Sequence, residues 1–248
     1  MSGHSKWAGI KHKKAVIDSK KGKVFSKIVR EINVACKEGG ANPDDNPRLR
    51  LVIQKAKQFN MPSDNIKRAL AKSANSSENY ESVRYEGYGP GGAAVMVEAQ
   101  TDNRRRTTQE IKNIFSSHGG SFGDVGSVSW MFSKKGCILA DASAGEEKIM
   151  DAAISAGADD IRETEDGFEI FTSPDNFEKV TDSLKAAGIK VLSADVSNFA
   201  ATNVALAGEK ARAVLRMMDE LENHDDVIDT SANFDIDDSE IEKFSNGL

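Results

Sequence analysis

The order of strand and helix patterns between Gly136 and Ser197 constrains the fold of this chain more than any other feature of its sequence. Short apolar runs typical of strands alternate there with helical stretches, in the order β-α-β-β-α-β. The helical stretches are GEEKIMDAAISAG and the segment from Pro174 to Gly188. This order is that of the split βαβ, or ferredoxin-like, unit. Residues 135–198 are therefore predicted to form a βαββαβ domain.

The segments on either side of this unit give the same order when they are joined across it. The expected elements are strands at 93–101, 127–133, 203–208 and 226–234, and helices at 103–118 and 209–222. Chain insertions are tolerated at hairpins. We therefore expect an interrupted α/β domain made of residues 80–134 plus 199–238, with the βαββαβ unit inserted into it.

Three amphipathic helices are predicted before residue 75. In the first, apolar residues recur at i, i+3, i+4, i+7 and i+11 from Phe25, and glycines at 39 and 40 end the helix. Asn46 followed by proline predicts the start of the second helix, and Ser63 the start of the third. Residues 73–79 are predicted to be a polar linker. The expected fold class is α+β: a basic arm and three-helix domain at 1–75, then two ferredoxin-like domains, the third inserted in the second.

Charge is divided unevenly along the chain. Residues 1–75 have a net charge of +11 and residues 76–248 a net charge of −17, which together give −6. An asymmetry of this kind suggests a nucleic-acid-facing module joined to an acidic body. The alternative is a set of solvated helix faces without a partner.

The basic residues of the first 75 positions are the candidate phosphate contacts. The stretch from Gly3 to Lys23 contains seven lysines, two histidines and Trp7. Lysine and histidine side chains donate to phosphates, and an exposed tryptophan can stack on an unpaired base. The candidate nucleic-acid-binding residues in this region are His4, Lys6, Trp7, Lys11, His12, Lys13, Lys14, Lys20, Lys21, Lys23, Lys27, Arg30, Arg48 and Arg50.

A second basic feature, Arg104, Arg105 and Arg106, lies in the acidic part of the chain, where a helix is expected to begin. The first turn of a helix disfavours cations because the backbone dipole is positive there. Three arginines at this place indicate a phosphate or carboxylate partner. Salt bridges to the surrounding acidic residues explain the arginines equally well.

Motifs for catalysis are absent from the sequence. GYGPGG matches G-x-G-x-x-G, but Pro90 lies inside it and a strand follows it, so a tight turn is predicted rather than a nucleotide-binding loop. The four histidines are scattered, there is no G-x-S-x-G motif, and the carboxylates of residues 219–242 have no metal-loop spacing and are expected to be solvated. We predict no enzyme, no cofactor, no metal and no small-molecule substrate.

The sequence also bears on the compartment. No run of about 18 apolar residues is present, so a membrane partner is not expected. The basic N-terminus has no arginine before Arg30, unlike typical transit peptides, and the two cysteines, Cys36 and Cys137, suit a reducing compartment. We expect a cytoplasmic protein.

Several motifs resemble those of the YebC/PmpR family, which includes the mitochondrial translational activator of cytochrome c oxidase. They are GHSKWAGIKHKK, GKVFSKIVREI, NPRLRLVIQKAK, NMPSDNIKRAL, YEGYGPGG and TDNRRRT, in this order along nearly the whole chain. The resemblance implies three domains, a helical one and two α/β ones, and a role as a cytoplasmic DNA-binding transcriptional regulator or a ribosome-associated translation factor. Gly9 and Arg105 depart from the family pattern, which expects asparagine at both, and leave the subfamily open.

Two functions are therefore compatible with the sequence. A DNA-binding regulator would use the second helix, with Arg48, Arg50, Gln54 and Lys57, to read base edges. A ribosome- or RNA-associated translation factor would use the lysine-rich arm and Trp7 on folded RNA. We therefore predict that the chain is a nucleic-acid-binding regulator of gene expression, whose partner is DNA or ribosomal RNA.

Overall fold

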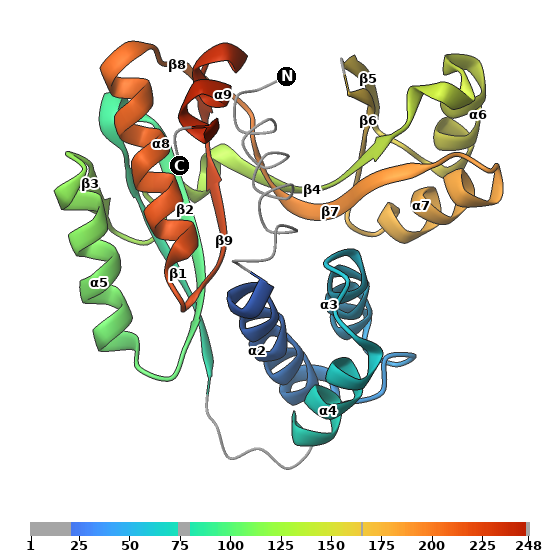
Figure 1. Cartoon of the computed structure of the whole chain (residues 1–248), viewed down its shortest axis with the longest axis horizontal. Coiled ribbons are helices and arrows are strands. Elements are labelled where there is room, and N and C mark those ends of the chain that lie inside the picture. The colour runs from blue at the N-terminus through green and yellow to red at the C-terminus, as the bar shows by residue number, and fades with distance from the viewer. Residues whose placement is uncertain (1–20, 74–79, 165, 247–248) are drawn as a thin grey trace. The chain divides into compact units, whose positions relative to one another are not determined.

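The computed structural model describes residues 21–73, 80–164 and 166–246 (Figure 1). These residues form two compact units. Unit 2 is Phe132–Ala201, and unit 1 contains the described residues before and after it. The predicted boundary between a helical domain and an interrupted α/β domain falls inside unit 1 and stays a prediction. Of the predicted linker, residues 74–79 lie outside the described residues.

Unit 1 begins with the three expected helices, α2 (Lys21–Gly39), α3 (Pro47–Gln58) and α4 (Ser63–Ser73). The predicted start of α3 is confirmed, because the Asn46 side chain accepts a hydrogen bond from the backbone N–H of Leu49 at 3.0 Å. The apolar stripes of the helices pack into one core, in which Ile28, Ile32 and Leu49 are fully buried. The amphipathic periodicity therefore decides which faces of the helices point inward.

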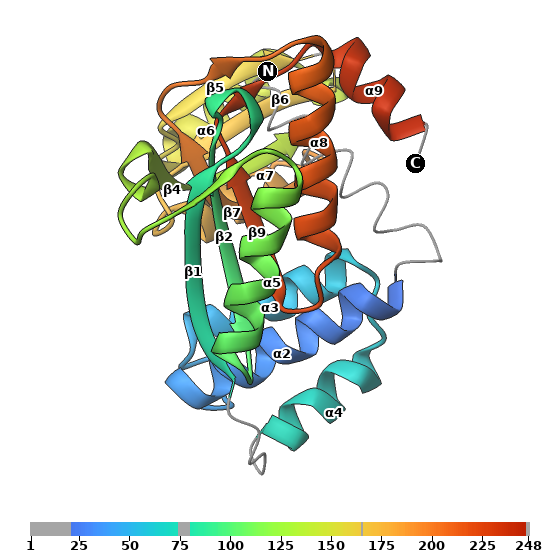
Figure 2. The same ribbon diagram turned by 90° about the vertical axis from the view of Figure 1, so that its left-hand side faces the viewer.

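An antiparallel sheet follows in unit 1, with strand order β3-β1-β2-β9. Its strands are β1 (Glu81–Tyr88), β2 (Ala94–Thr101), β3 (Ser121–Gly123) and β9 (Val227–Ala232). Helices α5 (Arg104–Ser117) and α8 (Gly208–Asn223) lie together on one face of it (Figure 2). Buried side chains from both helices, such as Phe115 and Leu215, join buried strand residues such as Val97 in one core.

The GYGPGG stretch covers the last two residues of β1 and most of the turn between β1 and β2. A 3-10 turn occupies Pro90–Gly92, and Gly91 and Gly92 have φ angles of 78° and 84°. Residues with side chains rarely adopt such angles, which explains the two glycines. The prediction of a tight turn is confirmed.

Of the strands predicted for this domain, the one at 127–133 was wrong, and the one at 203–208 forms as a shorter strand outside the main sheet. Residues 129–131 form a 3-10 turn instead of a strand, because the backbone N–H groups of Val128 and Ser129 donate to the buried Glu86 carboxylate and not to a neighbouring strand. Residues 204–205 form β8, which pairs in parallel with β10 (Phe234–Asp235) outside the main sheet. Their places in the sheet are taken by β1 and β3.

Unit 2 contains its elements in the order that the sequence predicts. They are β4 (Phe132–Ala140), α6 (Glu146–Ala156), β5 (Asp160–Thr164), β6 (Gly167–Thr172), α7 (Phe177–Ala186) and β7 (Val191–Ala200). The strands form an antiparallel sheet of order β5-β6-β4-β7. The coarse expectation, α+β with three helices followed by two sheets and their helices, is confirmed.

A further helix that was not predicted, α9 (Asp238–Asn246), ends the described chain. Its buried Ile241 joins the core of unit 1, and its Glu240 carboxylate accepts a hydrogen bond from the N–H of Gly208 at the start of α8. Among the described residues, no helix is both long enough and apolar enough to cross a membrane.

Candidate nucleic-acid interface

Part of the predicted interface cannot be placed. The candidates His4, Lys6, Trp7, Lys11, His12, Lys13, Lys14 and Lys20 lie outside the described residues, and of Lys21 only the backbone, at the start of α2, is described. The other candidates lie on α2, on α3 and at the start of α5. Their surroundings differ. Some of these cations form hydrogen bonds or ion pairs within the described residues, and others are exposed without such contacts.

The cations of α2 contact the C-terminal end of α8. Lys23 donates to the backbone carbonyl of Asn223 at 3.5 Å, and Lys27 donates to that of Glu222 at 2.6 Å. The last carbonyl groups of a helix have no partner within the helix, and the helix dipole makes this end negative. Lysines at i and i+4 on α2 therefore complement the end of α8.

Arg30, one turn further along α2, donates to the backbone carbonyl of Asp225 and to the Asp226 carboxylate, the latter at 3.2 Å. Its guanidinium also lies 5.9 Å from the centre of the Tyr80 ring. In this structure Arg30 therefore contacts the chain itself, and a phosphate that binds it has to replace the carboxylate.

The arginines of α3 are also engaged. Arg48 pairs with the Glu38 carboxylate at the end of α2, and Arg50 donates to the carbonyl oxygens of Pro43 and Asp44, each at 2.9 Å. These contacts hold the loop between α2 and α3. They do not leave Arg50 extended toward a groove, as a base-reading helix would need.

The three arginines of α5 have two different environments. Arg106 is paired: its guanidinium lies 2.7 Å from Asp226, 3.1 Å from Asp102 and 3.8 Å from Glu110. Arg104 and Arg105 are exposed, and neither side chain forms a hydrogen bond or ion pair with the part of the chain that the structure describes. Of the two explanations that the sequence left open, salt bridges account for Arg106 only.

Local structure explains why Arg104 and Arg105 stay exposed. Asn103 caps α5 by accepting the N–H of Arg106 at 3.1 Å. Thr107, on the inner face of the first turn, is fully buried and donates toward Asp226, with 2.7 Å between the oxygens. The two arginines before Arg106 therefore project outward at the positive end of the helix dipole.

Asp226 is the residue on which these contacts converge, and no sequence pattern indicated its role. It lies in the acidic stretch that was expected to be solvated, yet only 6% of its surface is exposed. Burial opposes ionisation of its carboxyl group, but hydrogen bonds from Thr107 and Arg106 and the charge of Arg106 hold its pKa below the usual value. The expectation of a solvated stretch was wrong for this residue.

Asp226 also belongs to the one group of possible metal ligands found among the described residues, with Glu110 and His224. The N–H of Asp226 donates to His224 Nδ1 at 3.1 Å, so the ring proton is on Nε2, which lies 3.0 Å from Glu110. Both nitrogens of His224 are thus engaged, and the oxygens of Asp226 accept from arginines and Thr107. The donor set fits a hydrogen-bond network rather than a metal centre.

These residues line a cavity of about 860 Å³, whose walls come from α2, α5 and the end of α8. Its charged side chains include Arg30, Arg106, Glu110 and Asp226, which pair with one another.

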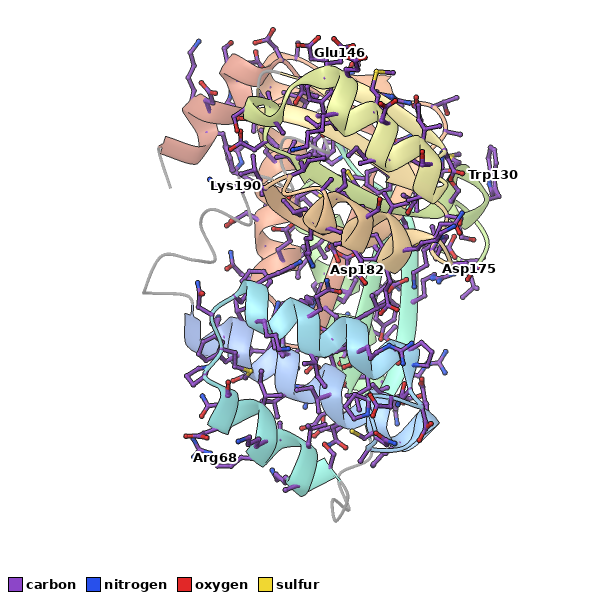
Figure 3. All side chains as sticks on the ribbon, turned by 90° about the vertical axis from the view of Figure 1, so that its right-hand side faces the viewer. Arg68, Trp130, Glu146, Asp175, Asp182 and Lys190 are labelled. Carbon is purple, nitrogen blue, oxygen red and sulfur yellow. The ribbon has the colours of Figure 1, made fainter. Side chains whose placement is uncertain are left out.

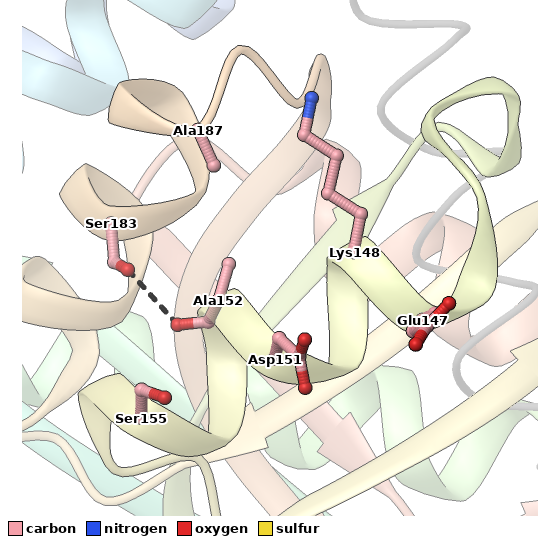
Figure 4. A pocket seen from close by; sticks show the side chains of 7 residues that line it. All are labelled: Glu147, Lys148, Asp151, Ala152, Ser155, Ser183 and Ala187. Atoms are coloured by element: carbon pink, nitrogen blue, oxygen red, sulfur yellow. Dashed lines mark hydrogen bonds between the residues drawn. The ribbon is translucent and has the colours of Figure 1, made fainter.

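A second opening, a groove of about 530 Å³, lies between α6 and α7 (Figure 4). There Ser183 donates to the carbonyl of Ala152 at 2.9 Å and not to a base. Neither opening presents a paired nucleophile and base.

Sequence reasoning also missed an ordered loop around Glu86. This carboxylate, 2% exposed, accepts hydrogen bonds from the N–H groups of Gly126, Val128 and Ser129 at 2.8 to 2.9 Å. Burial acts against its ionisation, but the backbone hydrogen bonds prevail and lower its pKa. The loop presents Trp130, whose side chain projects from the ribbon in Figure 3 and is 74% exposed.

Comparison with known proteins places the chain in a family. A model described as the N-terminal domain of TACO1/YebC proteins matches residues 5–76, and one described as the TACO1/YebC second and third domain matches residues 80–234. The chain belongs to the TACO1/YebC family. Its resemblance to this family in the sequence motifs is thereby confirmed.

This TACO1/YebC chain has relatives that align with it over nearly its full length. A probable transcriptional regulatory protein of Trichlorobacter lovleyi is 50% identical over 245 residues, which are 98% of this chain and 99% of the relative. One from Dictyoglomus turgidum is 47% identical over 99% of this chain and 100% of the relative. The crystal structure of a conserved hypothetical protein of Aquifex aeolicus, Aq1575, matches with a TM-score of 0.79 and 43% identity, covering 89% of this chain and 93% of that one.

Proposed function

We propose that this chain is a nucleic-acid-binding regulator of gene expression that works without catalysis. The relatives are described as probable transcriptional regulatory proteins, which supports a role in regulation and a nucleic-acid partner. The observation that carries the proposal is the exposed pair Arg104 and Arg105. The helix dipole disfavours these two cations at the start of α5, neither has a hydrogen bond or ion pair among the described residues, and an anion bound there would be stabilised by both the arginines and the helix end.

The phosphate backbone of DNA or RNA is the anion that fits. Helix N-termini and arginine side chains both donate to phosphate oxygens, and such contacts position a protein without reading sequence. The basic arm, with seven lysines between positions 3 and 23, supplies further phosphate contacts in this proposal. The acidic remainder of the chain would then limit indiscriminate binding.

Substitution of the two exposed arginines tests the proposal. The Arg104→Gln/Arg105→Gln variant is compared with Lys179→Gln/Lys185→Gln, which removes the same charge from exposed positions of α7. Fluorescence anisotropy with a labelled duplex DNA and a labelled RNA hairpin is measured over a range of salt concentrations. The arginine variant should lose affinity, and its slope of log K against log[salt] should fall by about 0.7–0.9 per lost contact. Equal affinity in wild type and both variants would reject the role of Arg104 and Arg105.

RNA, in a role as a ribosome- or RNA-associated translation factor, is the second candidate. The observation in its favour is that the arginines of α3, the helix expected to read base edges in DNA, contact Glu38 and the loop before α3. Trp7→Ala separates the two partners. Loss of one stacked base costs about 1–3 kcal/mol on single-stranded RNA, whereas duplex DNA, with its bases already stacked, should bind almost unchanged. Equal losses on both would favour DNA.

The finer architecture belongs to the same proposal. We infer that unit 2 is a ferredoxin-like domain inserted into the chain of the preceding α/β domain, because its sheet order β5-β6-β4-β7 is that of a βαββαβ unit. Regulation of gene expression by direct contact with nucleic acid also implies a cytoplasmic location in a bacterial cell.

A further inference from the structure

Three cations of α2 that lie on one helix face contact the C-terminal end of α8 and the residues just after it. Lys23, Lys27 and Arg30 are spaced at i, i+4 and i+7, so their side chains lie along one stripe. Their oxygen partners are Asn223, Glu222, Asp225 and Asp226, which all lie within residues 222–226. We call these seven residues the α2–α8 contact.

The partners in this contact resemble a phosphate backbone chemically. Each is an oxygen acceptor, carbonyl or carboxylate; the carbonyls of Glu222 and Asn223 are at the negative end of the α8 dipole, and the Asp225 and Asp226 acceptors follow it. A strand of nucleic acid also presents a row of anionic oxygens to lysines and arginines. The face of α2 that is suited to phosphates is therefore occupied by the chain's own acceptors.

Asp226 holds two of the candidate arginines at once. Its Oδ1 accepts from Arg30 on α2 at 3.2 Å, and its Oδ2 accepts from Arg106 on α5 at 2.7 Å. The carboxylate is 8% exposed, whereas the Arg30 and Arg106 side chains are 18% and 43% exposed. The arginines can therefore be reached from solvent, while the carboxylate that neutralises them stays inside.

We propose that Asp226 and the end of α8 compete with nucleic-acid phosphate for Arg30, Arg106 and the lysines of α2, so that the α2–α8 contact restrains binding. This inference rests on the proposed function and adds its regulation. Binding of nucleic acid transfers the cations of α2 from α8 to phosphates. The exposed pair Arg104 and Arg105 makes the first contact, because these side chains have no hydrogen bond or ion pair with the described residues to give up.

The competition has a measurable signature in salt. An arginine neutralised by Asp226 brings little net charge to a phosphate, so it releases few counterions on binding. Asp226 carries one charge, and Arg106 keeps Asp102 and Glu110 as partners when that charge is lost. Loss of the Asp226 charge should therefore steepen the slope of log K against log[salt] by about 0.7–0.9, the amount for one further phosphate contact. A residue that only stabilises the fold would not change this slope.

The test uses Asp226→Asn in the full-length chain, with the labelled duplex DNA and RNA hairpin as probes. Asparagine keeps an acceptor for the Thr107 hydroxyl but loses the charge. The control is Asp182→Asn, an exposed position on α7 labelled in Figure 3, where the same charge is removed away from the contact. Asp226→Asn should bind more tightly than wild type at low salt, and its slope of log K against log[salt] should be steeper by about 0.7–0.9, the amount for one phosphate contact. Asp182→Asn should show the wild-type slope.

A mutant cycle that combines Asp226→Asn with Arg30→Gln and Arg106→Gln tests whether the gain in affinity comes from these two arginines. If Asp226→Asn acts by releasing the two arginines, it should bring no gain when Arg30→Gln and Arg106→Gln are already present. A gain that persists in this background would overturn the inference. So would an Asp226→Asn protein that is folded and binds with the wild-type slope.

Hydrogen exchange on the wild-type chain covers the case in which Asp226→Asn does not fold. The N–H of His224 closes the last turn of α8 by donating to the carbonyls of Glu220 and Leu221. Addition of the RNA hairpin or the duplex should speed amide exchange at residues 222–227, because their side-chain partners on α2 leave. Unchanged exchange there, in a complex shown to form, contradicts the inference but not the proposed function. A wild-type chain that binds neither probe rejects both.

Discussion

The Glu86 carboxylate lies 2.8 Å from the backbone nitrogen of Val128, across 42 residues of sequence, and accepts its proton in a hydrogen bond. Two further N–H groups of the same loop donate to this carboxylate. The N–H groups of this loop thus donate to a buried carboxylate and not to the carbonyl groups of a neighbouring strand. The relationship explains why residues 127–133, with a strand-like apolar pattern, do not enter the sheet of unit 1.

Replacement of Glu86 by glutamine should destabilise unit 1. The amide oxygen can still accept, but the NH₂ group then faces an N–H donor, so at least one loop N–H loses its partner and the others lose a charged acceptor, at a cost of about 1–3 kcal/mol. Urea denaturation measures the change. Glu81→Gln, at an exposed position of the same strand, is the control and should stay within about 0.5 kcal/mol of wild type. Equal stability of the two variants would count against the role of the carboxylate.

Acid should weaken the fold through Glu86 and Asp226. Hydrogen bonds lower both pKa values in the folded chain relative to the unfolded chain, where carboxyl groups titrate near about 4. Their stabilising contribution is therefore complete above that pH and is lost as the pH falls through the lower, folded values. Unfolding free energies measured from neutral to acidic pH should decline below about pH 5, and less steeply in Glu86→Gln. A stability that rises on acidification would contradict this.

Arg106 and Arg105 should respond differently to the same substitution. Arg106→Gln removes a charged partner from buried Asp226, which should cost about 1–2 kcal/mol, since the arginine is itself partly exposed. Arg105→Gln removes an exposed cation with no partner among the described residues, so stability should stay within about 0.5 kcal/mol of wild type. Thermal or urea unfolding of the two variants gives the comparison. Similar losses in both would show that Arg105 also pairs within the protein.

Local signals in the sequence explain which parts of the fold were predictable. The helices α2, α3 and α4 follow from apolar periodicity and from caps such as Asn46, and unit 2 follows from alternating strand and helix patterns. Strand β1 was missed because its pattern is interrupted by Glu86, a charged residue that is buried only because distant N–H groups bind it. Contacts between residues far apart in the chain leave no local pattern.

The candidate interface shows the same limit. Sequence composition identified the cations, but not which of them the protein neutralises. Arg105 and Arg106 are neighbours of the same type, yet only Arg106 reaches Asp226, 120 residues later. The acidic run around Asp226 was expected to be solvated because nothing in its sequence marks one carboxylate as buried. Pairing of charges is decided by tertiary structure.

Salt dependence of nucleic-acid binding by the full-length wild-type chain tests the central claim most directly. Affinities for a duplex DNA and an RNA hairpin are measured from low to physiological salt. If lysines and arginines of unit 1 and of the arm contact phosphates, log K should fall linearly with log[salt], by about 0.7–0.9 per contact, for at least one of the two probes. No binding at low salt, or an affinity that is constant over this range, would contradict the account.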